Sequence, residues 1–182
     1  MESETKLWEQ FKTAIKTNIT AHSLSELYDI IKIKSKRRGY LKFDLCNKIA
    51  ADLGLEYLDN EEFLRVDYTL YRVGEHHRFK VPVICIESEN QFEYTEKEIC
   101  KLLSINAPLK VLIVYDLTVE ELKDNHWDYI IKDFLSVYGL IGIFAVMEIN
   151  TTEENSLKIS TMAFDNHGNN FEEYQRLLDV SL

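Results

Sequence analysis

Proline and glycine are scarce in this chain, with two and six residues among 182. No stretch rich in serine, glycine or proline separates two halves of the sequence, and we see no internal repeat, so no linker between domains is apparent. With a hydrophobic content of 46%, the chain is long enough to bury the core of one ordinary globular domain. We therefore predict a single domain over residues 1–182.

Cysteine is also rare, and its number is odd. Cys46, Cys85 and Cys100 are widely spaced in apolar surroundings, which is typical of buried thiols rather than of disulfides or zinc ligands. The first residues, Met-Glu-Ser-Glu, contain no apolar segment of a secretory signal, and no apolar run approaches the roughly 18 residues of a membrane span. These absences predict a cytoplasmic protein without a membrane partner.

The motifs of several enzyme classes are missing as well. The sequence has no glycine-rich phosphate loop, no His-Glu-x-x-His, no paired Cys-x-x-Cys and no Gly-x-Ser-x-Gly. Positive charge is in the minority, because 21 basic residues stand against 31 acidic ones and the net charge is −10. Such a surface disfavours general adhesion to the phosphate backbone of nucleic acids.

One segment reverses this charge. Residues 32–42 contain lysines and arginines but no acidic residue. Two explanations stay open. Lys34, Lys36, Arg37 and Arg38 could contact a nucleic-acid backbone, or the run could be the solvated end of a helix, where cations favour the helix dipole.

Helical spacing of apolar residues dominates residues 1–54 and predicts a helical layer. A capping box of Ser23 with Glu26 begins the second helix. A third helix is expected over about 41–53, with Gly54 as its C-terminal stop.

The middle of the sequence changes to short runs rich in β-branched and aromatic residues. Strands near 63–73 and 79–89 are expected to form a hairpin around a turn at 74–77. The apolar run 109–115 has the length of a strand buried on both faces, and a helix over about 96–105 precedes it. Strand, helix and strand in this order indicate a right-handed parallel crossover.

The remaining elements are two strands near 141–149 and 157–164, and helices that begin at capping boxes. The predicted fold class is therefore α/β, a mixed β-sheet flanked by helices. Residues 1–54 form the helical layer, 55–116 the core and 117–182 a C-terminal set of helices and strands. The capping boxes pair Thr95 with Glu98, Thr118 with Glu121 and, for a short final helix, Asn170 with Glu173.

Three carboxylates stand where strands usually carry apolar residues. Asp67 lies in the first strand of the expected hairpin, and Glu87 and Glu89 lie in the second. An ionised carboxylate beside a sheet core is costly to desolvate unless a cation or several hydrogen bonds meet it. A hairpin loop of odd length would place all three on one face, where they could hold Mg²⁺ or Mn²⁺ together with the Ser88 carbonyl. A loop of even length would separate them.

The order of these elements resembles the core of the PD-(D/E)XK nuclease-like superfamily, also called restriction-endonuclease-like. The similar stretch runs from about 41 to 116, and the run Ile86-Glu-Ser-Glu-Asn90 resembles an uncharacterised, degenerate bacterial branch of that superfamily. The resemblance implies a restriction-endonuclease-like fold in which Asp67 is the metal-binding Asp and Glu87 the acid of Glu-x-Lys. It also implies Mg²⁺-dependent phosphodiester hydrolysis in DNA or RNA.

The sequence departs from the family pattern at Glu89, which occupies the position of the Lys. In such nucleases the Lys lowers the pKa of the attacking water and offsets developing negative charge. Glu89 carries the opposite charge, and by resemblance it could ligate a second ion or orient water. Lys97 and Lys101, in the following helix, are predicted to lie opposite its buried stripe, so neither is a well-placed replacement.

Several functions therefore stay open. The chain could be an active metal-dependent nuclease, an inactive nuclease-fold protein for binding or assembly, or an acidic, inhibitor-type protein that binds a partner. Alternatively, Arg65, Arg72 or Lys80 could neutralise the carboxylates in a charge cluster without a ligand. Nucleic acid, another protein or a second copy of the chain are the candidate partners.

Overall fold

The computed structural model describes residues 2–58, 63–73, 80–116, 127–139, 141–151 and 156–181. The helices are α1 (Glu2–Thr20), α2 (Leu24–Lys32), α3 (Lys34–Tyr40), the π-helical turn η1 (Leu41–Leu45), α4 (Cys46–Leu53), α5 (Phe92–Leu103) and α7 (Trp127–Tyr138). The strands are β1 (Glu56–Tyr57), β2 (Tyr68–Val73), β3 (Lys80–Glu89), β4 (Leu109–Tyr115), β5 (Ile143–Asn150), β6 (Ser156–Phe164) and β7 (Asn170–Ser181).

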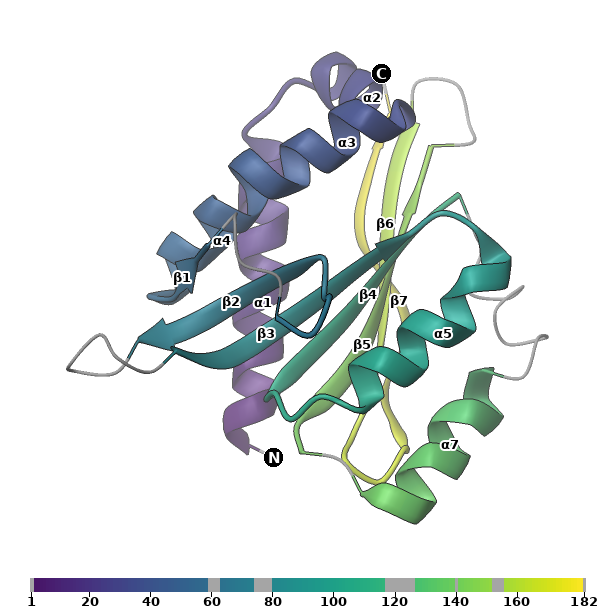
Figure 1. Ribbon diagram of the computed structural model, residues 1–182. Coiled ribbons are helices and arrows are strands. Elements are labelled where there is room, and N and C mark those ends of the chain that lie inside the picture. The colour runs from purple at the N-terminus through teal and green to yellow at the C-terminus, as the bar shows by residue number, and fades with distance from the viewer. Residues whose placement is uncertain are drawn as a thin grey trace.

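The strands form one seven-stranded mixed sheet in the order β1 to β7 (Figure 1). The pairs β3–β4 and β4–β5 are parallel, whereas the other neighbouring strands are antiparallel. Because α5 connects β3 to the parallel strand β4, the predicted parallel crossover is confirmed. The predicted α/β class, a mixed sheet flanked by helices, is also confirmed.

Helices cover both faces of the sheet (Figure 1). The segment from α1 to α4 packs on one face, and α5 and α7 pack on the other. Successive residues of β4 alternate between the two cores, so that Val111 faces the N-terminal helices and Leu112 faces α5. As predicted, β4 is buried along its whole length.

Two expected properties of the chain concern thiols and membranes. Cys46, Cys85 and Cys100 are free thiols; the first two are buried and the third is half-buried. Within the ranges that the structure describes, none of the helices combines the length and apolar character needed to cross a membrane.

The N-terminal helices follow the sequence signals closely. The backbone N–H of Ser23 donates to Glu26 and the Ser23 hydroxyl accepts from the Glu26 N–H, which confirms the capping box. Gly54 ends α4 with φ +64°, as predicted for a C-terminal stop. The third helix is longer than the expected 41–53, because α3 leads into α4 through η1 and helical structure begins at Lys34.

Two capping signals do not mark the beginning of a helix in the structure. Thr95 lies inside α5 and is buried, because this helix begins three residues earlier, at Phe92. The predicted final helix at Asn170 and Glu173 is wrong, since these residues begin β7, whose pairing with β6 extends the sheet. Tertiary pairing overrides a local helix signal here. The capping box at Thr118 and Glu121 and the turn at 74–77 lie outside the described residues.

The first strand of the hairpin begins later than predicted. A turn occupies 63–67, in which Leu64 and Arg65 have φ of 52° and 63° and the Val66 N–H donates to the Phe63 carbonyl. Asp67 therefore lies immediately before β2 rather than inside a strand.

The hairpin loop has the even length that was expected to separate Asp67 from Glu87. Val73 pairs with Lys80, which leaves the six residues 74–79 between the paired ends. Of the two alternatives, the structure has the even loop.

A β-bulge in the middle of the hairpin compensates for the even loop. Tyr71 pairs with Pro82, whereas Leu70 pairs with Ile84, so the ladder skips Val83. Between the bulge and the beginning of β2, even-numbered residues pair with even-numbered ones and odd-numbered with odd-numbered ones, as in Tyr68 with Ile86. This register places both carboxylates on the sheet face that α5 covers.

Candidate functional site

Charged side chains from three separate segments line one pocket of about 230 Å³, which we call the carboxylate pocket. It lies at the carboxyl end of β3. Its charged lining includes Lys34 and Arg38 from α3, Asp67 and Glu87 from the hairpin, and Glu98 and Lys101 from α5.

Asp67 is held by the backbone of the opposite strand. Its Oδ2 accepts a hydrogen bond from the Ser88 N–H at 3.1 Å. The side chain is open to solvent, yet partial burial of the carboxylate raises its pKa above the ordinary value. The Ser88 hydrogen bond and the charges of Lys101 and Arg38 oppose this shift without cancelling it. The predicted metal-binding role of the Ser88 carbonyl stays a prediction.

Glu87 is the most deeply buried carboxylate of the pocket, with 2% of its surface exposed. Burial raises its pKa to about 8, and the negative charge of Asp67 contributes to the same shift. The ion pair with Lys101 opposes the shift. A cation bound beside Glu87, in addition to Lys101, would therefore be stabilised by the carboxylates of Asp67 and Glu87.

Lys101 occupies the centre of the charge cluster, although its helical position predicted a place opposite the buried stripe. Its Nζ lies 2.5 Å from Glu87 Oε1 and 3.1 Å from the Arg65 carbonyl oxygen, and it also contacts Glu98 Oε2. Burial lowers the pKa of Lys101, but the contacts with the two glutamates outweigh it and hold the pKa above its ordinary value.

The misplacement of Lys101 has a physical cause. The prediction used only the position of its Cα around the helix axis, measured from Ile99, which packs in the core. A lysine ammonium stands at the end of a flexible four-carbon stem, so it can reach round the side of a helix. Glu98, three residues earlier, was the available signal, because the two side chains are neighbours on a helix. Lys97 is exposed, in agreement with the prediction.

Glu89 does not join the other carboxylates. It lines the pocket, but its Oε1 accepts the backbone N–H groups of Asn90 (2.7 Å) and Gln91 (2.8 Å) at the beginning of α5. Among the described residues, no three His, Cys, Asp or Glu side chains converge as a metal cage. Glu89 therefore lines the pocket with one carboxylate oxygen already bound by backbone N–H groups, and its predicted catalytic role stays a prediction.

The cation that pairs with Glu87 also differs from the prediction. It is Lys101, and among the described contacts Arg65 reaches the cluster through its backbone carbonyl. Arg72 pairs with Val81 and Lys80 pairs with Val73 at the loop end of the hairpin, beyond the bulge and away from Asp67.

The basic run brings three of its predicted nucleic-acid contacts, Lys34, Arg37 and Arg38, to the pocket. Lys34 and Arg38 line it and are exposed, so both are available to a phosphate backbone. Lys36 is exposed on α3 but is outside the pocket lining.

Arg37 also has a structural position. It is 7% exposed, its Cζ lies 3.9 Å from the centre of the Tyr115 ring, and its Nη1 donates to the Ile31 carbonyl at 3.0 Å. Its guanidinium thus joins α3 to β4, and its predicted contact with nucleic acid stays a prediction.

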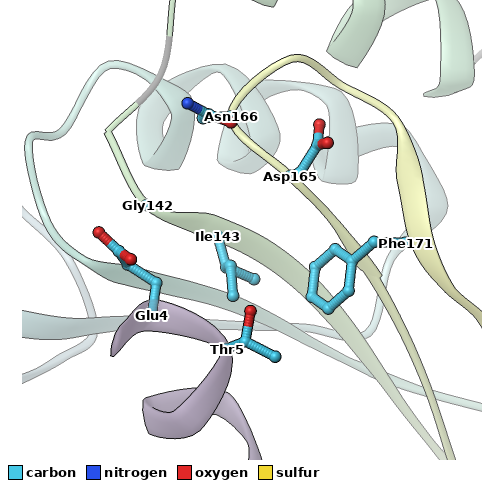
Figure 2. A pocket seen from close by; sticks show the side chains of 7 residues that line it. All are labelled: Glu4, Thr5, Gly142, Ile143, Asp165, Asn166 and Phe171. Carbon is cyan, nitrogen blue, oxygen red and sulfur yellow. The ribbon is translucent and has the colours of Figure 1, made fainter. Parts of the chain in front are cut away.

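A second pocket, of about 120 Å³, lies at the opposite end of the parallel strands, where β5 begins (Figure 2). The side chains of Ile143 and Phe171 face it, and Glu4 and Asp165 add carboxylates (Figure 2). Asp165 accepts backbone N–H groups of the turn that follows it, from His167 and Asn169. Its carboxylate therefore stabilises the turn between β6 and β7.

Comparison of the chain with protein-family models, with curated proteins and with solved structures gives no match. The carboxylate pocket is therefore the feature from which a function can be inferred.

Proposed function

We propose that this protein is a cytoplasmic, metal-dependent nuclease of the PD-(D/E)XK type, in which the catalytic lysine comes from α5. One observation carries the proposal. Lys101 Nζ lies 2.5 Å from Glu87 Oε1, beside Asp67, although the strand position of the family lysine is occupied by Glu89. A cation and two acids are thus combined at the point where the hairpin pattern requires them.

Asp67 and Glu87 would hold the divalent cation. Mg²⁺ is usually bound by one or two carboxylates, with water and substrate phosphate oxygens completing its shell, so this pair is a sufficient protein donor set. A bound cation would also favour the ionised form of Glu87, which burial and Asp67 disfavour. The chemistry that it supplies is polarisation of the phosphoryl group and a lower pKa of bound water.

The remaining residues have distinct roles in this proposal. Lys101 offsets negative charge that develops on the scissile phosphate, as an ammonium in a partly desolvated pocket can. Lys34 and Arg38 bind the backbone of DNA or RNA beside the pocket, which sets the orientation of the strand. Glu89 stabilises the beginning of α5 and takes no part in catalysis.

A nuclease assay tests the proposal. Single- and double-stranded DNA and RNA would be incubated with wild type, Asp67→Asn, Lys101→Met and the exposed control Lys97→Met, with Mg²⁺ or Mn²⁺ at low salt. We expect Asp67→Asn and Lys101→Met to reduce the rate by about 100-fold or more, and Lys97→Met to leave it unchanged. Activity that survives Lys101→Met and chelation would contradict the mechanism. A folded wild type that cleaves none of the four substrates would overturn the nuclease assignment.

An inactive nucleic-acid-binding protein of the same fold is the second candidate. It is favoured by the ion pair itself, because Lys101 neutralises Glu87 as it would in a cluster without a ligand. Fluorescence anisotropy with labelled DNA and RNA would then show binding that Arg38→Ala weakens, with no hydrolysis by any variant. The net charge of −10 is the feature that favours an acidic, inhibitor-type protein.

A further inference from the structure

The Lys101 ammonium lies among three acceptor oxygens. It forms ion pairs with Glu87 Oε1 and Glu98 Oε2, and its Nζ donates a hydrogen bond to the Arg65 carbonyl at 3.1 Å. It also supplies Glu87 with the positive charge that a divalent cation would supply. Lys101 and the metal would therefore compete for the same carboxylate.

Two of the three acceptors do not depend on the metal ligands. Glu98 lies three residues before Lys101 on α5, so this contact is within one helix turn. The Arg65 carbonyl is presented by the turn at 63–67, where Leu64 and Arg65 have left-handed backbone conformation. If Glu87 turned to a cation, Lys101 would keep its contacts with Glu98 and with the Arg65 carbonyl.

The exposure of the two glutamates supports different roles. The Glu87 side chain is 3% exposed, whereas that of Glu98 is 13% exposed and that of Lys101 is 24% exposed. The Glu98–Lys101 pair thus lies on the solvent side of the buried acid. A shift of the ammonium from Glu87 towards Glu98 would move it outward, into the pocket.

We propose that Glu98 is a positioning residue that retains Lys101 when a divalent cation takes over Glu87. The inference rests on the proposed metal site and deepens it. Glu98 acts through the lysine and does not ligate the cation. Its carboxylate holds the ammonium at the pocket, with one N–H directed to the substrate phosphate.

A double-mutant cycle on metal affinity tests this role without any assay of hydrolysis. Mn²⁺ would be titrated by calorimetry, and by the loss of its free electron-paramagnetic-resonance signal, into wild type, Glu98→Gln, Lys101→Met and the double variant. Glu96→Gln, an exposed charge change on the same helix, is the control. Circular dichroism would establish that each variant is folded.

The proposal predicts opposite effects for the two single variants. Lys101→Met should bind Mn²⁺ about tenfold more tightly, because the competing cation is gone. Glu98→Gln should bind it about tenfold more weakly, because Lys101 then stays on Glu87. In the Lys101→Met background, Glu98→Gln should change the affinity by less than about threefold. Glu96→Gln should behave as wild type.

Three results would overturn the inference. An equal loss from Glu98→Gln in both backgrounds would identify Glu98 as a direct ligand, and weaker binding by Lys101→Met would exclude competition. In both cases, Mn²⁺ binding that Asp67→Asn abolishes would leave the metal site of the proposed function intact. Absence of Mn²⁺ binding by wild type and Lys101→Met alike would overturn the metal site and the inference together.

Discussion

The guanidinium of Arg37 lies over the aromatic ring of Tyr115, with 3.9 Å between its Cζ and the ring centre. This contact joins α3 to the last residue of β4, at the sheet end where the carboxylate pocket lies. Because Lys34 and Arg38 flank Arg37 on α3, the buried arginine fixes the position of the two exposed cations.

Replacement of Arg37 should therefore affect folding, whereas replacement of Arg38 should affect binding. We expect Arg37→Ala to lower the free energy of unfolding by about 2 kcal/mol, since a cation–π contact and a hydrogen bond to the Ile31 carbonyl are lost. Arg38→Ala should change it by less than about 0.5 kcal/mol but weaken binding to labelled DNA or RNA. Urea denaturation and anisotropy measure the two effects. Similar unfolding energies for both variants would refute this assignment.

Glu87 should make stability depend on pH in the acid-to-neutral range. Its pKa of about 8 in the folded protein is above the ordinary 4.5, so between these values the folded chain holds a proton that the unfolded chain has released. The free energy of unfolding should fall as pH rises from 4.5 to 8, by up to about 1.4 kcal/mol per pH unit from this group. Glu87→Gln should remove this contribution, and Glu96→Gln should retain it. Urea denaturation at several pH values measures this dependence. If the unfolding free energy of Glu87→Gln fell with pH as steeply as that of wild type, the raised pKa of Glu87 would be refuted.

Lys110 should have the opposite effect at higher pH. This lysine is fully buried on β4, where its Nζ donates to the Ala107 carbonyl at 2.8 Å and to the Ile141 carbonyl, and burial lowers its pKa to about 7. Between pH 7 and 10.5 the unfolded chain holds a proton that the folded chain has released. Stability should therefore rise with pH over this range, by up to about 1.4 kcal/mol per unit.

The variant Lys110→Met removes this titration, so its unfolding energy should rise less between pH 7 and pH 9.5 than that of wild type. Lys97→Met, at an exposed position of α5, is the matched control and should keep the wild-type slope. Urea unfolding under reducing conditions gives the comparison. A parallel pair of curves for wild type and Lys110→Met would show that the lysine stays charged.

Glu172 connects α1 to the last two strands. Its carboxylate accepts from Trp8 Nε1 at 2.9 Å, from Lys12 Nζ at 2.5 Å and from Thr161 Oγ1 at 2.9 Å. Burial favours the protonated acid, but these hydrogen bonds outweigh it and lower the pKa of Glu172. The ionised form is therefore the one that the fold stabilises.

Removal of this carboxylate should be among the most damaging single substitutions. Glu172→Ala leaves the Lys12 charge buried without its main partner, and we expect a loss of about 3–5 kcal/mol in unfolding free energy. Glu173→Ala, the exposed neighbour, should lose less than about 0.5 kcal/mol. Trp8 fluorescence follows both unfolding transitions. Equal midpoints for the two variants would show that the cluster contributes little.

Local patterns predicted the elements that depend on local physics. The apolar run 109–115 is a buried strand because its composition suits no other environment. Ser23 caps α2 because its side chain accepts a hydrogen bond from the nearby backbone N–H of Glu26. β7 could not be predicted in this way. Its capping signal at Asn170 and Glu173 is local, whereas its strand structure comes from pairing with β6.

In the candidate site, too, some residues could be predicted from local signals and others depend on the tertiary structure. Asp67 and Glu87 could be selected because charged residues are unusual near a sheet core. Lys101 could not, because its place in the cluster depends on where α5 lies and on the turn that supplies the Arg65 carbonyl. Glu89 has the residue type of a ligand, but the N–H groups of Asn90 and Gln91, just before α5, bind its carboxylate.

The skipped residue Val83 has a consequence for how such proteins can be found. It shifts the strand register by one residue in the middle of the hairpin. The number of residues between Asp67 and Glu87 therefore depends on this bulge as well as on the requirements of the site. A protein with the same hairpin but a regular ladder would bring its two acids together at a separation one residue shorter. A search pattern with a fixed interval between the acids would pass over one of the two, although their sites would superimpose.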